Sequence, residues 1–437
     1  MIYQFMEVTL TNINQCFTRI APCLTRPNRL QSFLTGVLLL SFFNQPAFAA
    51  VIGKVVQPFA SYTFTADDNM LRIRDRLDPV PLFGTNNLFD MSHRFTGGLL
   101  FEKEISRQRL TADLNWTHTT FEKFNQMDNN LKNLNGNWNW FLGNRLEGNM
   151  GASYVQSLAP FLFQPGTKNI RTEQREFINA IWRFHPSWNL HGDYTRYDLS
   201  TDSPVDRLKF LNRIEDRFEG GIDYVTSRRN TVGILFRNII GDFTSPPRAA
   251  DGSPLITDND YDQKAVMARI NWVVTEKSRL VWTGGWVERK NASFSERDFS
   301  GFNARMIYAW EPTSKVGLTL NAWRETGTMQ QITASFSLNT GVSIVPSWNI
   351  TQKVALEGNF SYETREFSRF VVLTDPILSV GRNNTIRNAA VKLTYTPYLG
   401  LQLSASVYNN YLKTDNALGG FSANGANINL QYIYGKR

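Results

Sequence analysis

The sequence predicts an all-β fold: a closed antiparallel transmembrane β-barrel of about 18 strands that follows a cleaved signal peptide. Three observations predict it. The chain starts with an export leader, the rest has neither cysteine nor a long apolar segment, and hairpins with alternating apolar and polar residues recur along it. Alternation with a period of two gives each strand one apolar and one polar face.

The first 49 residues have the layout of a secretory signal peptide. Three arginines precede an apolar run over residues 33–43, and small residues occupy the expected cleavage positions up to Ala49. The run is short for a membrane-spanning helix, which needs about 20 residues. We therefore predict a signal peptide over 1–49 and an outer-membrane β-barrel over 50–437.

Composition narrows the class of protein further. Both cysteines, Cys16 and Cys23, lie in the leader, so disulfides and thiolate metal sites are not expected in the mature chain. No later segment approaches 18 consecutive apolar residues, yet the chain has 11 tryptophans and 31 phenylalanines. This suits a membrane barrel, whose hydropathy signal per strand is weak. The net charge of +8 falls to +6 without the leader, too small to predict nucleic-acid binding.

The clearest hairpin covers residues 95–124 and turns at Ser106–Gln108. After the turn, Leu114 and Trp116 alternate with polar residues such as Asp113. One face of this hairpin is therefore expected to meet lipid, and the other to meet an aqueous lumen.

Similar hairpins recur down the mature sequence. Short turns are expected near 106–108, 143–144, 186–187, 227–228, 276–277, 312–314, 346–348 and 398–400. Longer polar connections are expected at 66–88, 159–170, 199–211, 241–260 and 365–384, with shorter ones near residues 126, 292, 327 and 416. In bacterial outer-membrane barrels short turns face the periplasm and long loops the exterior. The loop 241–260, with two adjacent prolines, is the candidate for folding over the mouth.

Tryptophans near the short turns support the membrane interpretation. Amphipathic rings collect at the membrane–water interface, whereas a soluble β-sandwich would bury them in mid-strand. The tryptophans expected to form this girdle are Trp140, Trp182, Trp188, Trp272 and Trp310.

The polar strand faces carry charges of both signs and are expected to line the lumen. The candidate lumen-lining residues are Arg175, Arg183, Arg217, Arg237, Arg269, Arg305, Lys353, Lys392, Asp113 and Asp193. Such a wall suits a conduit for a charged or polyhydroxylated solute. It also suits a lumen held together by ion pairs, because buried charges need partners.

No catalytic or metal-binding motif stands out, so we predict no enzyme activity and no cofactor. The chain has no GxSxG, HExxH or phosphate-binding glycine loop. His191 is expected to point into the lumen beside Asp193, as a hydrogen-bonded lining residue. Acidic groups at 67–69 and at 258, 260 and 262 could bind calcium, but neither has the EF-hand spacing, and solvated loops are expected.

Four phrases resemble the EpsL-type outer-membrane proteins of exosortase-associated exopolysaccharide systems. They cover residues 61–75, 105–128, 142–161 and 171–190, all in the first half of the chain. The resemblance implies an outer-membrane barrel in exopolysaccharide biosynthesis or export, and it supplies no catalytic residues. The end of the chain departs from the usual pattern. Outer-membrane barrels commonly finish on an aromatic residue, whereas here residues 435–437 follow the last aromatic residue, Tyr434.

The expected function is therefore a conduit through which an extracellular polysaccharide crosses the outer membrane. A polar lumen would replace the hydration of the sugar with exchangeable hydrogen bonds. The expected partners are outer-membrane lipid, the polysaccharide and periplasmic polysaccharide-export components, with no nucleic acid. A general diffusion porin for small polar solutes is the first alternative, and a structural or lipid-modifying barrel is the second.

Overall fold

The structure is a computed structural model. It describes residues 55–159, 168–202, 209, 211–245, 259–293, 295–328, 336–367, 383–415 and 418–435. The predicted signal peptide, most of the loop 241–260 and most of the loop 365–384 lie outside these ranges. No helix in the described part of the chain is long and apolar enough to cross a membrane.

The described chain forms one sheet of 18 antiparallel strands, as the sequence predicts. The strands are β1 (Val56–Asp67), β2 (Asp90–Ile105), β3 (Gln108–Phe121), β4 (Asn129–Leu142), β5 (Leu146–Leu158), β6 (Ile170–His185), β7 (Trp188–Thr201), β8 (Arg213–Val225), β9 (Thr231–Phe243), β10 (Tyr261–Thr275), β11 (Ser278–Asn291), β12 (Phe299–Trp310), β13 (Val316–Thr328), β14 (Phe336–Asn349), β15 (Val354–Phe367), β16 (Asn383–Tyr398), β17 (Leu401–Thr414) and β18 (Phe421–Ile433).

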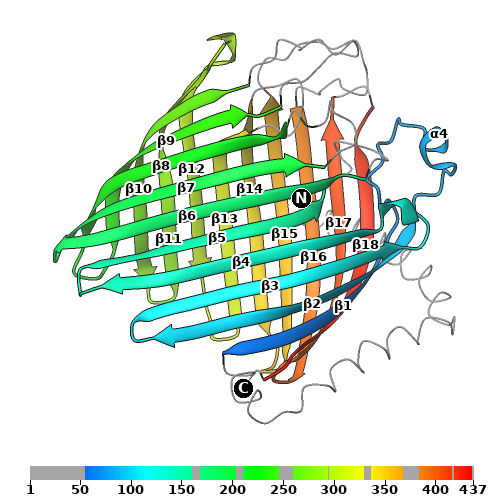
Figure 1. The fold of residues 1–437 in the computed structure, drawn as a ribbon, viewed down its shortest axis with the longest axis horizontal. Helices are drawn as coiled ribbons and strands as arrows, with labels where there is room; N and C mark the ends of the chain where they lie inside the picture. Colours follow the sequence, from blue (N-terminus) through cyan, green and yellow to red (C-terminus); the bar gives the residue numbers. More distant parts are fainter. Residues whose placement is uncertain are drawn as a thin grey trace.

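The sheet closes on itself because its first and last strands pair. Each strand pairs with its neighbours in sequence, and β1 also pairs with β18 from Phe59 opposite Ile433 to Asp67 opposite Gly425. Figure 1 shows the strands wrapping around a common axis. Closure removes the free sheet edge, whose unpaired backbone groups lipid cannot satisfy.

The outer surface of the barrel is apolar. On β3, Leu114 and Trp116 are 43 % and 48 % exposed, and on β9 Phe236 is 63 % exposed. Side chains of this size would be buried in a soluble protein of this length, whereas lipid favours them on the surface. The protein is thus an outer-membrane barrel, and the hairpin β2–β3 presents its apolar face to lipid.

Short turns occur where the sequence predicts them, with one exception. The turn expected at 346–348 lies at 350–353, because β14 continues through Pro346 to Asn349. Proline is tolerated here because the register with β15 is interrupted beside it, so no N–H is required there. Gly358 on β15 leaves room for the ring, since a Cβ at that glycine would lie 3.0 Å from Pro346 Cγ.

Tryptophans lie near both ends of the apolar belt. The five predicted girdle residues occupy outward positions on their strands near short turns, and Trp182 is 50 % exposed. Trp116 and Trp286, at 48 % and 59 % exposure, face outward nearer the opposite end, which carries the longer loops. Trp323 instead faces inward and donates a hydrogen bond to Glu363 at 2.8 Å.

The connection between β1 and β2 is a folded loop. It contains the short helix α4 (Val80–Phe83), which Figure 1 shows at the rim that carries the longer loops. Leu71 and Ile73 from this loop pack with Phe124 and Met127, the latter in the 3-10 helix η4 (Asn125–Met127). A second 3-10 helix, η6 (Ser295–Arg297), connects β11 and β12. The rim at β1–β3 therefore has a small hydrophobic core of its own.

One close approach in the wall gives a test of the sheet packing. A Cβ added to Gly285 of β11 would lie 2.0 Å from the carbonyl oxygen of Val266, a backbone atom of the adjacent strand β10. We expect Gly285→Ala to lower the free energy of unfolding by about 1–3 kcal/mol, as overpacking typically does. Gly136→Ala is the control, because no atom lies within 4 Å of its Cβ position. Denaturant titration of the refolded protein measures the difference, and equal stabilities would contradict the packing.

Candidate functional site

The inner wall of the barrel is the candidate functional site. Inward positions alternate with the exposed apolar ones: Ile178 and Trp182 of β6 face outward, so Arg175 and Arg183, at the alternate positions of the strand, face inward. By the same strand register the inward candidates are Arg175, Arg183, Arg217, Arg237, Arg269, Arg305, Lys392, Asp113 and Asp193. Lys353 was wrongly assigned to a strand, because it lies in the displaced turn before β15.

Ion pairs link the charges on strands β7, β8 and β9. Arg217 lies between two carboxylates, with its Nη2 3.4 Å from Asp193 Oδ1 and its Nε 3.2 Å from Glu219 Oε1. Arg237 Nε lies 2.9 Å from the same Glu219 oxygen. Opposite charges on adjacent strands stabilise each other in this way. These paired inward charges, here called the charged arc, stabilise the wall by linking adjacent strands, and they also face the lumen.

Other inward charges are paired as well. Arg171 Nε lies 2.9 Å from Glu173 Oε1, and Arg213 Nε lies 2.6 Å from Glu215 Oε1. Further inward pairs join Arg183 to Glu147, Arg305 to Glu325 and Arg365 to Glu363. The charged arc therefore covers β5 to β15, and inward charges continue beside it, with Lys392 on β16 and the pair Arg109–Glu102 at 2.6 Å on β3 and β2.

Arg175 differs from these arginines. It is exposed and has no carboxylate at ion-pair distance among the described residues. Its guanidinium instead lies 5.5 Å from the centroid of the Phe177 ring. Asp113 accepts one hydrogen bond, from Asn115 Nδ2 at 3.1 Å. Arg175 is therefore a cation that a solute in the lumen could contact.

Stacked arginines near the long-loop rim were not predicted from the sequence. Arg289 is 3 % exposed, and its guanidinium lies 3.3 Å from the Tyr261 ring centroid and 5.7 Å from that of Phe336. Arg213 lies 5.6 Å from the Tyr197 ring centroid. Cation–π contacts of this kind stabilise desolvated arginines. The residues lie on different strands, so only strand registration reveals the pairs.

A second arc of the wall, on β17, β18 and β1, is uncharged apart from Asp67 at the rim. Its inward side chains are mainly amides and hydroxyls that hydrogen-bond from strand to strand. The contacts are Asn410 to Asn388 of β16 at 2.9 Å, Asn427 to Ser406 at 3.3 Å and Asn429 to Thr63 at 2.8 Å. Asparagines at alternate positions of β4 face the lumen as well. In the sequence, asparagines at every second position of a strand were the pattern that indicated a neutral inner surface.

His191 lies in the inner wall on the same face as Asp193, as predicted, and the carboxylate nearest to its ring is that of Asp223 on β8. Its Nδ1 lies 3.0 Å from Asp223 Oδ2, while Asp193 is paired with Arg217. Asp223 Oδ1 also lies 3.4 Å from Arg269 Nε. The ring fits because Gly221 has no side chain there, since a Cβ would lie 2.6 Å from His191 Cε1. Asp193 is two residues away in sequence, but Asp223 lies on the adjacent strand.

The acidic groups at 67–69 serve as hydrogen-bond acceptors within the rim. Asp67 is fully buried and accepts from Tyr408 Oη at 2.5 Å and Arg72 Nη1 at 2.9 Å. Asp68 accepts from the Asn424 backbone N–H at 2.7 Å. The expectation of a solvated loop was therefore wrong at this position. Asp258 of the second group lies outside the described residues, and no cluster of metal-ligating residues occurs in the described part.

Comparison with known proteins yields structural matches, among them three of low sequence identity. No protein-family model and no curated protein sequence matches the chain. OccAB3 of Acinetobacter baumannii has 10% identity and a TM-score of 0.44, covering 88% of this chain and 100% of its own. OccK2 (OpdF) of Pseudomonas aeruginosa has 8% identity and a TM-score of 0.46, covering 87% and 98%. A BenF-like porin of Pseudomonas fluorescens Pf-5 has 9% identity and a TM-score of 0.44, covering 87% and 99%. These values describe a loose likeness between barrels and carry no information on solutes.

Proposed function

We propose that the protein is a passive channel for polar solutes across the outer membrane. The observation that carries this proposal is the closed 18-strand wall whose inward positions are mainly polar. Barrels of 16–18 strands are wide enough to enclose an aqueous channel, whereas side chains fill barrels of about eight strands. Paired arginines and carboxylates keep such a wall stable in contact with water.

The two arcs of the wall suggest which solutes pass. The charged arc from β5 to β15 offers donors and acceptors of both signs, and the arc on β17, β18 and β1 offers neutral amides and hydroxyls. Polyhydroxylated solutes can exchange hydrogen bonds with both surfaces as they move. A wall of mixed sign also admits small ions of either charge.

Planar-bilayer recording tests the channel proposal. We expect the purified mature chain to give steady conductance in salt solution, because the lumen is lined by polar groups. Liposome swelling with neutral sugars of increasing size then measures which solutes pass. An incorporated, correctly folded barrel that neither conducts nor admits small sugars would contradict the proposal.

Arg175 provides the sharper electrical test. Since it has no carboxylate partner, Arg175→Gln removes a free positive charge from the lumen. We expect the anion-to-cation permeability ratio to fall by roughly two- to fivefold, because a unit charge at about 4 Å in water is worth about 1 kcal/mol. Reversal potentials in a salt gradient measure this ratio. Arg196→Gln is the control, since Arg196 is paired with Asp216 on the outward face; an equal shift in both variants would contradict the assignment.

A polysaccharide conduit is the second candidate function. The neutral amide and hydroxyl arc favours it, because such groups can replace sugar hydration without holding a polymer tightly. The phrases that resemble EpsL-type proteins favour the same candidate. Deleting the gene separates the two functions: loss of surface polysaccharide with unchanged small-solute uptake supports the conduit, and the reverse result supports the channel.

A further inference from the structure

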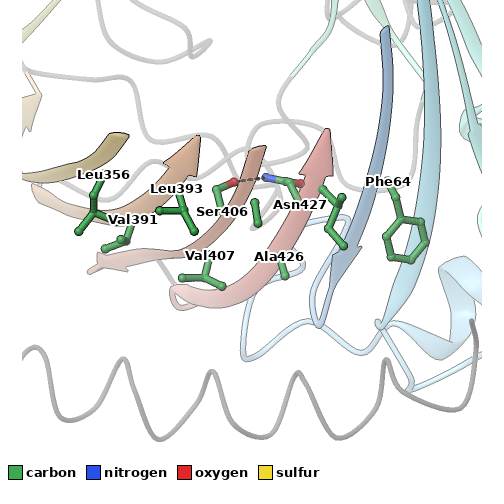
Figure 2. A pocket seen from close by; sticks show the side chains of 10 residues that line it. Phe64, Leu356, Val391, Leu393, Ser406, Val407, Ala426 and Asn427 are labelled. Carbon is green, nitrogen blue, oxygen red and sulfur yellow. Dashed lines mark hydrogen bonds between the residues drawn. The ribbon is translucent and has the colours of Figure 1, made fainter. Parts of the chain in front are cut away.

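The outer wall carries an apolar groove over strands β15 to β18 and β1. Its volume is about 240 Å³, and Val391, Ala405, Val407 and Ala426 contribute to its lining. Figure 2 shows that Val391, Val407 and Ala426 lie on one side of the sheet, opposite the hydrogen-bonded pair Ser406 and Asn427. Since Ser406 and Asn427 face the lumen, the groove opens toward lipid.

The groove exists because small residues interrupt the row of large outward side chains. Ala405 lies between Leu393 of β16 and Ile428 of β18 in the strand register, and both of these are larger. Ala426 similarly lies opposite Val407. The gap is lined almost entirely by hydrocarbon, so its occupant must be apolar.

A cation lies on the same outward face, further toward the long-loop rim. Arg387 of β16 precedes Val391 by four residues, which is about 13 Å along a strand. Its guanidinium is held between two aromatic rings, 5.6 Å from the Tyr362 centroid and 5.4 Å from the Tyr411 centroid. Its Nε has no hydrogen-bond partner among the described residues.

A second cation lies diagonally across from it on the next strand. Arg387 is opposite Tyr411, and Lys413 is opposite Thr385 one row further out. Diagonal neighbours of this kind are separated by about 7–8 Å, within reach of long side chains. The nearest outward carboxylates in this register are Glu366, opposite Asn383, and Asp415, which accepts a hydrogen bond from the Asn383 N–H at 3.2 Å; both lie one row beyond Lys413. Arg387 and Lys413 can therefore converge on one anion.

We propose that this face binds one phosphate-bearing lipid of the outer leaflet, with its phosphate on Arg387 and Lys413 and an acyl chain in the groove. The negative phosphate of a lipid complements the two cations, which lie toward the long-loop rim. The apolar acyl chain suits the groove, which lies closer to the middle of the membrane. Arginine and lysine donate charge-assisted hydrogen bonds to phosphate oxygens. The order of cations and apolar groove matches the order of headgroup and acyl chain.

Native mass spectrometry of the purified mature chain with diphosphoryl lipid A tests the proposal. We expect Ala405→Phe, which fills the groove, to abolish the bound-lipid peak. Ala322→Phe is the control, because it makes the same change at an outward position of β13. Heat-modifiable migration in gels checks that each barrel is folded. Equal lipid occupancy in the two folded variants would overturn the proposal.

The phosphate contact is tested separately. We expect the double variant Arg387→Gln, Lys413→Gln to bind diphosphoryl lipid A roughly tenfold more weakly, as expected when charge-assisted hydrogen bonds are lost. Its affinity for dephosphorylated lipid A should not change. Lys264→Gln is the control, because Lys264 is paired with Asp262 at 3.1 Å. Equal affinity of the double variant and the unchanged protein for diphosphoryl lipid A would overturn the proposal. So would a dimer that Ala405→Phe dissociates, because the groove would then bind a second copy of the chain.

Discussion

Replacing Leu114 by arginine is expected to destabilise the barrel by about 2–4 kcal/mol, the cost of a cation on the lipid face near the bilayer midplane. Leu114 lies at the centre of β3 and is 43 % exposed on the outward side. The arginine would have to be buried in hydrocarbon without a partner. Equilibrium unfolding of the protein in lipid vesicles measures the loss.

Thr111→Arg is the matched control for this prediction. Thr111 lies on the same strand but faces the lumen, opposite Asn137 of β4. An arginine there reaches water, so we expect a change of less than about 1 kcal/mol, as for ordinary surface substitutions. Similar losses at both positions would mean that the inward and outward assignments are wrong.

Replacing Asp67 by alanine is expected to release the loop 68–89 from the rim. Asp67 is fully buried, and its carboxylate lies 2.9 Å from Arg72 Nη2. Burial by itself would lower the pKa of Arg72, but the charge of Asp67 and its hydrogen bond outweigh burial, and the pKa is raised. Removing the carboxylate leaves the cation and the Tyr408 hydroxyl without this acceptor. Breaking a buried pair costs about 3–5 kcal/mol.

Limited trypsin digestion measures that release. Arg72, Arg74 and Arg76 lie in the loop, and their cleavage should become much faster in Asp67→Ala while the strands remain protected. Asp78→Ala is the control, because Asp78 accepts one exposed hydrogen bond from the Val80 N–H at 3.0 Å. Unchanged cleavage in Asp67→Ala, or equal acceleration in both variants, would contradict the anchoring role.

Local sequence patterns were sufficient for the strands and for most turns. In β3 the alternation of Asp113, Leu114 and Trp116 settles which side chain faces which way, because successive side chains of a strand point to opposite faces. Pro346 shows the limit of this reasoning. Proline usually marks a turn or a sheet edge, and whether a strand can contain it depends on the partner strand, here on Gly358.

The pairing of charges could not be predicted in the same way. His191 shares a face with Asp193 as expected, but the alternation gave no sign of Asp223, which is 32 residues away in the chain and adjacent to His191 in space. The buried role of Asp67 likewise depends on Tyr408, on the strand that pairs with β18. Contacts of this kind depend on the stagger between strands, which no single strand encodes.

By itself, the sequence determined that this chain is an exported barrel of 18 strands with an apolar outer face and a polar inner wall, because strand periodicity is a local property. The tertiary structure decided which inward charges pair, that Arg175 has no carboxylate partner, and that a groove and two cations share one outward face. The physical reason is that closing the sheet sets the register of every strand against its neighbours, and the register brings distant residues together.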